Sequence, residues 1–172
     1  MKKIICIKLI LLTFLGYAIT AGADSRLNSH TDYPKTTYDG VAQLFEMYPC
    51  PIQCTTLTGD LDKKSFAEWK NFKTRIIEGS KRKVNFGGQF IIVEWGCGTE
   101  CQMGAMIDAS TGKIYEIPSS AYGKAYKKGS LLFIVNPPSK NPSENVRPHY
   151  GYPAYYFWDG DEFKLLHDTK EK

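Results

Sequence analysis

The sequence lacks the short motifs that mark common nucleotide-binding and hydrolase sites. It has no phosphate-binding loop and no G-x-S-x-G elbow, and its G-C-G at residues 96–98 is not followed by the third glycine and the helix of a dinucleotide turn. It has no internal repeat and no low-complexity tract. Its three histidines, His30, His149 and His167, are widely spaced and are expected to be exposed. The residues therefore predict no cofactor, no metal site and no catalytic group.

The N-terminal residues 1–23 have the three parts of a secretory signal peptide. Residues 1–8 carry three lysines, residues 9–19 form an apolar run, and the A-G-A at residues 21–23 fits a small-x-small cleavage site. Cleavage there leaves residues 24–172 as a single globular domain that is secreted or periplasmic and has no further membrane span. A retained N-terminal anchor is the alternative. The sequence gives no indication of the oligomeric state.

Export changes the charge argument. The chain has 22 basic and 18 acidic residues, but the predicted signal peptide holds Lys2, Lys3 and Lys8 and no acid. Removing those three lysines leaves 19 basic against 18 acidic residues in the mature protein. A nearly neutral protein has no electrostatic footprint for nucleic acid, and we expect none as a partner.

Export also decides how the cysteines are interpreted. Loss of Cys6 leaves Cys50, Cys54, Cys97 and Cys101, and four cysteines in an oxidising compartment indicate two disulfides with three possible connectivities. The two CxxxC spacings favour the local bridges Cys50–Cys54 and Cys97–Cys101, with bridges between the two pairs as the main competitor. A five-residue ring stabilises the fold by about 2 kcal/mol. A zinc site or a nucleophilic thiol at residues 97–101 is the weaker interpretation.

The fold class predicted is α+β. An apolar run at residues 89–95 is typical of a strand with both faces covered, and strands at 102–108 and 113–117 follow it in an antiparallel meander. Asp108 and Gly112 favour the turn between the last two. A further strand at 130–135 and an aromatic hairpin at 155–158 and 163–167 complete a sheet of five or six strands.

Helices are predicted at two places. Residues 65–78 begin with a capping box of Ser65 and Glu68, and Gly79 supplies the stop, so this amphipathic helix is expected to pack on one face of the sheet. Apolar residues at helical spacing favour a short helix over 41–48.

Residues 119–129 are interpreted as a loop. The proline-rich residues 136–148 are also expected to be a long loop, mobile or functional.

Four segments carry a family resemblance. They are F-K-T-R-I-I-E-G at 72–79, N-F-G-G at 85–88, W-G-C-G-T-E-C-Q at 95–102 and D-A-S-T-G at 108–112. Together they resemble a family of small secreted bacterial proteins with the pattern NFAGxY…WGCGxxCQ…DxxTGxVY and no established activity. Gly87 and Phe90 depart mildly from that pattern. The resemblance covers about residues 72–115 and implies export but no catalytic residue.

Size, export and disulfide use are shared with periplasmic inhibitors and immunity proteins that act on wall-degrading enzymes, so by analogy the sequence predicts a non-catalytic binding protein. Its partner would be an envelope protein or a cell-wall component. The contact surface is expected at the loop 96–101 together with residues 137–152. The candidate binding residues are Thr99, Glu100, His149, Tyr150 and Tyr152. Aromatic residues on one face of the strand 155–158 form either a further contact platform or part of a strand buried on both faces.

A thiol-dependent enzyme is the rival hypothesis. It would use Cys97 or Cys101 as nucleophile, His149 as base and Asp159 or Glu94 to orient the base. An oxidising compartment pairs such thiols, and no helix begins after either cysteine to lower its pKa. The sequence therefore favours the binding protein.

Overall fold

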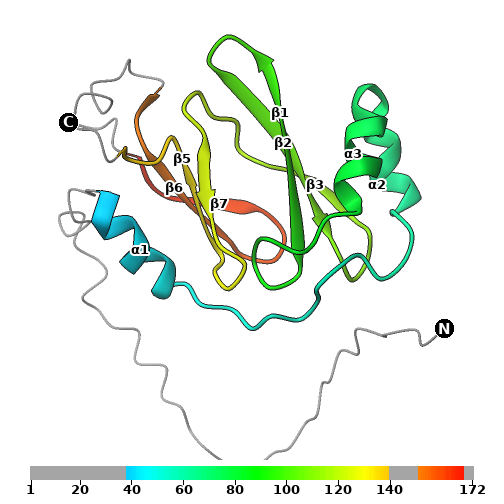
Figure 1. Ribbon diagram of the computed structural model, residues 1–172, viewed down its shortest axis with the longest axis horizontal. Coiled ribbons are helices and arrows are strands. Elements are labelled where there is room, and N and C mark those ends of the chain that lie inside the picture. Colours follow the sequence, from blue (N-terminus) through cyan, green and yellow to red (C-terminus); the bar gives the residue numbers. More distant parts are fainter. Residues whose placement is uncertain (1–37, 140–150, 169–172) are drawn as a thin grey trace, which may run out of the picture.

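The computed structural model describes residues 38–139 and 151–168 (Figure 1). The predicted signal peptide, His30, His149 and Tyr150 lie outside them. The helices are α1 (Tyr38–Glu46), α2 (Lys63–Glu68), the 3-10 turn η2 (Lys70–Phe72) and α3 (Lys73–Ser80). The strands are β1 (Phe90–Gly98), β2 (Cys101–Asp108), β3 (Ile114–Glu116), β4 (Lys124–Tyr126), β5 (Leu132–Val135), β6 (Ala154–Trp158) and β7 (Phe163–Asp168).

The predicted α+β class and the antiparallel meander are confirmed. The described strands form two sheets rather than one, with the orders β1-β2-β3 and β4-β5-β6-β7, and all pairs are antiparallel. Figure 1 shows the two sheets side by side, with α2 and α3 outside the first sheet and α1 outside the second. The described part of the chain therefore has four layers, in the order helices, sheet, sheet, helix.

A separate hydrophobic cluster fills each space between layers. Ile91, Val93 and Trp95 of β1 pack under α2 and α3, whereas Phe90 and Ile92 point into the space between the sheets. Successive side chains of a strand point to opposite faces, so one continuously apolar strand can supply two clusters. The prediction that this strand is covered on both faces is confirmed. A third cluster, with Leu44 and Phe45, joins α1 to the second sheet.

The predicted helix over 65–78 differs from the structure at its start. Helix α2 begins at Lys63, and its N-cap is Asp62, whose carboxylate accepts a hydrogen bond from the Ser65 amide at 2.8 Å. Asp62 is a strong N-cap residue, and its position ahead of Ser65 moves the helix start by two residues. The capping box predicted from Ser65 and Glu68 is therefore wrong.

The same segment is also interrupted at Trp69 (φ −95°, ψ 35°), which separates α2 from the 3-10 turn and α3. The rings of Trp69 and Phe72 lie 6.0 Å and 4.9 Å from the ring of Trp95 on β1, between centroids. Burial of a large apolar side chain contributes about 2–3 kcal/mol, against about 1 kcal/mol for a hydrogen bond. Packing of these rings therefore outweighs the hydrogen bonds lost where the helix breaks.

Gly79 does not end the helix as predicted, because α3 continues to Ser80. A Cβ atom at Gly79 would collide with the side chain of Val93. The glycine instead allows α3 to lie directly against β1. By contrast, Gly112 has the predicted positive φ of 74° and closes the turn between β2 and β3, where its amide donates to the Asp108 carbonyl at 2.8 Å.

Strand β4 lies inside the segment 119–129 that was expected to be a loop. Its three residues are too short to show a periodic pattern, and pairing with β5 defines it. The aromatic strand β6 is buried on both faces, since Tyr155 packs toward α1 and Trp158 packs between the sheets, each with 2% exposure. It is therefore not an exposed platform. Among the described residues no helix has the length and apolarity to span a membrane.

Candidate functional site

The β1–β2 hairpin ends in an exposed turn, residues 96–101, which we call the tip. Gly96 pairs with Gln102 and Gly98 pairs with Cys101, which leaves Cys97 as an extra residue in a bulge. Every residue from 96 to 100 is exposed, although the preceding part of β1 is the most buried strand of the first sheet. The tip therefore extends a rigid core element into solvent.

The tip is closed by a disulfide between Cys97 and Cys101, whose Cα atoms are 5.1 Å apart. This confirms one of the two predicted local bridges. Within the ring, Glu100 has a positive φ of 52°, which is uncommon for a residue with a side chain. A five-residue ring holds the tip in one backbone shape before any partner arrives, because it removes conformations from the chain.

The predicted Cys50–Cys54 bridge is not formed, because Cys50 is a free thiol. The Sγ atom of Cys50 lies 3.9 Å from the Lys128 carbonyl, whereas Cys54 lies in the cluster under the helices with 4% exposure. Residues 53 and 54 are held by their amides, which both donate to the Gly88 carbonyl. Burial raises the pKa of the Cys50 thiol, so little of it is the reactive thiolate at neutral pH.

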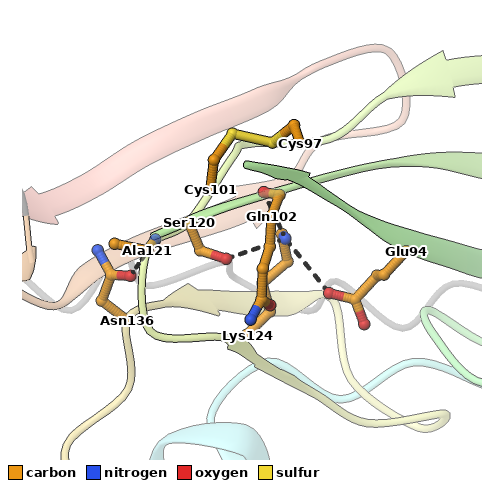
Figure 2. The surroundings of a disulfide bond; sticks show 8 residues. All are labelled: Glu94, Cys97, Cys101, Gln102, Ser120, Ala121, Lys124 and Asn136. Carbon is orange, nitrogen blue, oxygen red and sulfur yellow. Dashed lines mark hydrogen bonds and ion pairs between the residues drawn. A yellow bond between two sulfur atoms is a disulfide. The ribbon is translucent and has the colours of Figure 1, made fainter. Parts of the chain in front are cut away.

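A buried lysine ties the base of the tip to the second sheet. Lys124 of β4 has a fully buried side chain, and its Nζ atom lies 3.3 Å from the Glu94 carboxylate of β1. The same ammonium donates to the Gln102 carbonyl at 3.1 Å and to Ser120 Oγ at 3.0 Å. Figure 2 shows these three contacts directly below the disulfide. Three acceptors match the three donors of an ammonium group, so the buried charge is satisfied.

The environment of this ion pair shifts two pKa values. Burial lowers the pKa of Lys124, and the opposite charge of Glu94 works against that shift. Tyr126 donates to the second Glu94 oxygen at 2.9 Å. Burial, followed by the negative charge of Glu94, raises the pKa of Tyr126 well above its usual value. The Lys124 ammonium and the Tyr126 hydroxyl thus each engage one carboxylate oxygen of Glu94.

A cavity of about 410 Å³ lies beside this pair, between α1 and β4. Phe45 and Pro138 form part of its apolar lining, and Glu94 and Lys127 are among its charged groups. Glu94 is engaged by Lys124 and Tyr126, and Lys127 lies 3.4 Å from the Glu46 carboxylate. Among the described residues that line the cavity, every charged side chain therefore has a partner, and we do not assign the cavity a ligand.

A second set of hydrogen bonds connects the tip to the chain beyond β5. The hydroxyl of Tyr122 donates to the Glu100 carboxylate at 3.4 Å, and the Tyr122 and Ala121 amides donate to the side-chain oxygen of Asn136 at 2.8 Å and 2.9 Å. The Asn136 amide group donates in turn to the Tyr152 carbonyl at 3.3 Å. Glu100 and Tyr152, both predicted from the sequence, are thus joined through two residues that the sequence analysis missed.

The other predicted residues are placed as follows. Thr99 is exposed at the end of the tip, and Tyr152 is exposed beside Asn136, whereas His149 and Tyr150 lie outside the described residues. Neither Tyr122 nor Asn136 has a sequence motif. One available signal was the position of Asn136 immediately before Pro137 and Pro138, because asparagine tolerates the positive φ of 51° found there.

The groups of the hypothetical thiol enzyme are not brought together in the described residues. Cys97 and Cys101 are bonded to each other, and Glu94 is engaged by Lys124 and Tyr126. Asp159 lies in the β6–β7 turn, where its carboxylate accepts from two backbone amides. A disulfide has no thiolate, so this state offers no nucleophile at the tip.

Within residues 38–139 and 151–168, no group of three or more His, Cys, Asp or Glu side chains is arranged to hold a metal ion. Comparisons of the chain with protein-family models, with curated proteins and with solved structures find no match.

Proposed function

We propose that this chain is an exported, non-catalytic binding protein that contacts an envelope protein through the tip. The contact surface is centred on Thr99, Glu100 and Tyr122, and continues toward Tyr152. The observation that carries the proposal is the disulfide-closed tip, in which five consecutive exposed residues extend from the buried end of β1.

The support comes from preorganisation. A loop that must be ordered on binding loses affinity, because its conformational entropy is lost at that moment. Here the disulfide fixes the ring, and Lys124 and Ser120 hold its base against the second sheet. A rigid, protruding loop fits the concave sites of other proteins, which is how many inhibitors engage enzymes. Periplasmic inhibitors of wall-degrading enzymes remain the best analogy.

The exposed groups of the tip suit a polar contact. Glu100 offers a carboxylate at the turn, and the Tyr122 ring beside it has 37% exposure. Tyrosine provides a large contact area with few rotatable bonds, and it is enriched at binding hot spots. A partner with a cationic group at its centre would complement Glu100.

The test is a pull-down from an extract of the cell envelope with the immobilised protein. We compare the wild type with a Thr99→Ala/Glu100→Ala double variant and quantify every captured protein by mass spectrometry. The matched control is Thr74→Ala/Glu78→Ala, which removes the same two side-chain types from exposed positions of α3. At least one protein should be captured tenfold less by the tip variant and equally by the control.

Capture of the same proteins in equal amounts by the wild type and the tip variant would contradict the proposal. Both variants change exposed side chains. Their free energies of unfolding, measured in urea, should therefore match that of the wild type to within about 0.5 kcal/mol, as is usual for surface substitutions. A free thiol at Cys97 or Cys101, detected by alkylation of the purified protein, would instead favour the thiol-dependent enzyme.

A further inference from the structure

A second surface feature lies on the side of the molecule where the two sheets meet. It is an open groove of about 490 Å³ between the end of β3 and the β6–β7 hairpin. One wall is formed by residues 115–119, and the other by Tyr156, Trp158 and the turn residues up to Phe163. Its volume falls in the range of ligand-binding clefts. No residue of the tip lines it, so it is separate from the proposed contact surface.

The walls of the groove carry aromatic rings. Trp158 lies between Tyr115 and Phe163, with ring centroids 4.9 Å and 5.0 Å away. Tyr115 already receives a cation on its ring, because Lys113 Nζ lies 4.5 Å from the ring centroid. The electron-rich faces of Tyr and Trp attract ammonium and guanidinium groups. These rings therefore suit a ligand with a cationic end and an aliphatic stem.

Trp158 also leaves one polar atom unsatisfied. Its side chain has 2% exposure, and its Nε1 atom has no hydrogen-bond partner. Buried indole N–H groups usually find an acceptor. A carbonyl oxygen brought in by a ligand that displaces part of the groove wall would supply the missing acceptor.

The charges that line the groove all have the same sign. Glu116 stands at the end of β3, and Asp161 and Glu162 stand in the opposite turn. None of the described lining residues is a lysine or arginine, although Lys113 lies over the ring of Tyr115. Glu162 is paired with Lys164. Glu116 and Asp161 form no ion pair within the described residues. Two carboxylates that form no ion pair among the described residues therefore line the groove, one at the end of β3 and one in the β6–β7 turn, although the mature chain as a whole is nearly neutral.

We propose that this groove binds a lysine or arginine side chain on an extended segment of a protein partner. The aliphatic stem would lie on the half-buried rings of Tyr115 and Tyr156, with Trp158 behind them, and the cationic end would be held by Glu116 and Asp161. A peptide segment fits better than a free small cation because β3 is an edge strand of its sheet. The Ile114 amide already donates to Ser65 Oγ, so such a segment would meet β3 at its end, near Glu116. This site goes beyond the proposed function, since it does not require that the tip has a partner.

The test uses NMR titrations of the purified protein with short probes of defined charge. The probe is the capped peptide Ala-Lys-Ala-Lys-Ala, and its neutral counterpart has norleucine at both lysine positions. The chain has three tryptophans, so the indole N–H signals of Trp69 and Trp95 serve as internal controls. The lysine peptide should shift the Trp158 signal alone, and its affinity should fall at least threefold between 20 mM and 200 mM salt.

Variants then test the carboxylates. Glu116→Gln/Asp161→Asn keeps the size of both side chains and should weaken binding of the lysine peptide at least fivefold. The matched control Glu68→Gln/Glu78→Gln neutralises two exposed carboxylates on α2 and α3 and should leave the affinity unchanged. All four positions are exposed, so we expect each double variant to fold.

Three outcomes would overturn the inference. The norleucine peptide could shift Trp158 with the same affinity as the lysine peptide, which would make the groove merely apolar. The Glu116→Gln/Asp161→Asn variant could bind the lysine peptide as tightly as the control variant. Spermidine, a free polyamine, could bind more tightly than the peptide, which would exclude a protein segment as the preferred occupant. None of these readouts depends on Thr99 or Glu100, so failure here and failure at the tip are distinguishable.

Discussion

The two long hairpins of the molecule hold their turns in different ways. The β1–β2 turn is closed by the Cys97–Cys101 disulfide, and a fully buried lysine ties its base to the other sheet. The β6–β7 turn has no covalent link. Asp159 accepts hydrogen bonds there from the amides of Asp161 and Glu162, and Lys164 forms ion pairs with Asp159 and Glu162, all at exposed positions.

The difference lies in how strongly water competes with each set of contacts. Exposed ion pairs contribute about 0–1 kcal/mol, because water and salt screen the charges. A buried ammonium exchanges its protein partners for water less readily than an exposed one, so its removal leaves buried partners such as the Gln102 carbonyl unsatisfied. We expect the tip to keep its shape without a partner, as a recognition loop should, and the β6–β7 turn beside the acidic groove to adjust more readily.

The largest expected effect comes from Lys124→Met. This change keeps the aliphatic stem but leaves Glu94, the Gln102 carbonyl and Ser120 without their shared donor. We expect the free energy of unfolding to fall by about 2–4 kcal/mol, less than for a wholly buried pair because the Glu94 side chain has 31% exposure. Urea unfolding measured by tryptophan fluorescence provides the value.

Lys127→Met is the matched control, three residues along the chain. Lys127 forms an exposed ion pair with Glu46 and lies over the Phe45 ring, so its loss should change the free energy of unfolding by about 1 kcal/mol or less. Equal losses of unfolding free energy in the two variants would show that burial does not make the Lys124 contacts more stabilising than the exposed contacts of Lys127.

The next prediction compares how much each of the two turns contributes to the free energy of unfolding. Replacing both Cys97 and Cys101 by alanine should lower the free energy of unfolding by about 2 kcal/mol, because the unfolded chain regains the conformations of the open ring. Asp159→Ala in the other hairpin should have a smaller effect, because its contacts are exposed. If Asp159→Ala lowered the free energy of unfolding more than loss of the disulfide does, the β6–β7 turn would be the more strongly held of the two.

The smallest expected effect concerns pH. Tyr126 has a raised pKa in the folded protein, so the folded state keeps its proton at a pH where the unfolded state, with a pKa of about 10, has lost it. The stabilisation by Tyr126 is therefore fully present below about pH 10 and is lost as the pH rises above that value. Tyr126→Phe should lower the free energy of unfolding by about 1 kcal/mol at pH 8, and this difference should shrink toward pH 11.

Comparison of the wild type with Tyr126→Phe isolates this hydroxyl, because all other tyrosines and Lys124 titrate in both proteins. A difference that stays constant between pH 8 and pH 11 would mean that the Tyr126 hydroxyl ionises equally in the folded and unfolded states.

Much of the local structure was predictable from particular residues. The apolar run at 89–95 identified β1 and its two covered faces, the D-G at residues 159–160 marked the last hairpin, and the spacing of Cys97 and Cys101 indicated their bridge. These signals are local, because they depend on side-chain alternation, turn chemistry and the reach of a short ring.

Other features depend on contacts between distant residues. Nothing near Lys124 in the chain indicates that it is buried, since its acceptors come from residues 94, 102 and 120. The break at Trp69 follows from the position of Trp95, and the partnership of Asn136 with Tyr122 and Tyr152 joins three separate loops. The acidic groove likewise exists only because β3 lies opposite the β6–β7 turn.

By itself, the amino-acid sequence determined the class of fold and the central meander, because each follows from neighbours in the chain. It favoured the closed turn at residues 97–101 without fixing the pairing, since the same spacing at Cys50 and Cys54 forms no bridge. The tertiary structure decided that the strands divide into two sheets and that a lysine is buried between them. It also decided which carboxylates keep a cation and which face the groove without one. The physical reason is that burial and charge pairing are set by which surfaces meet, and those surfaces come from segments far apart along the chain.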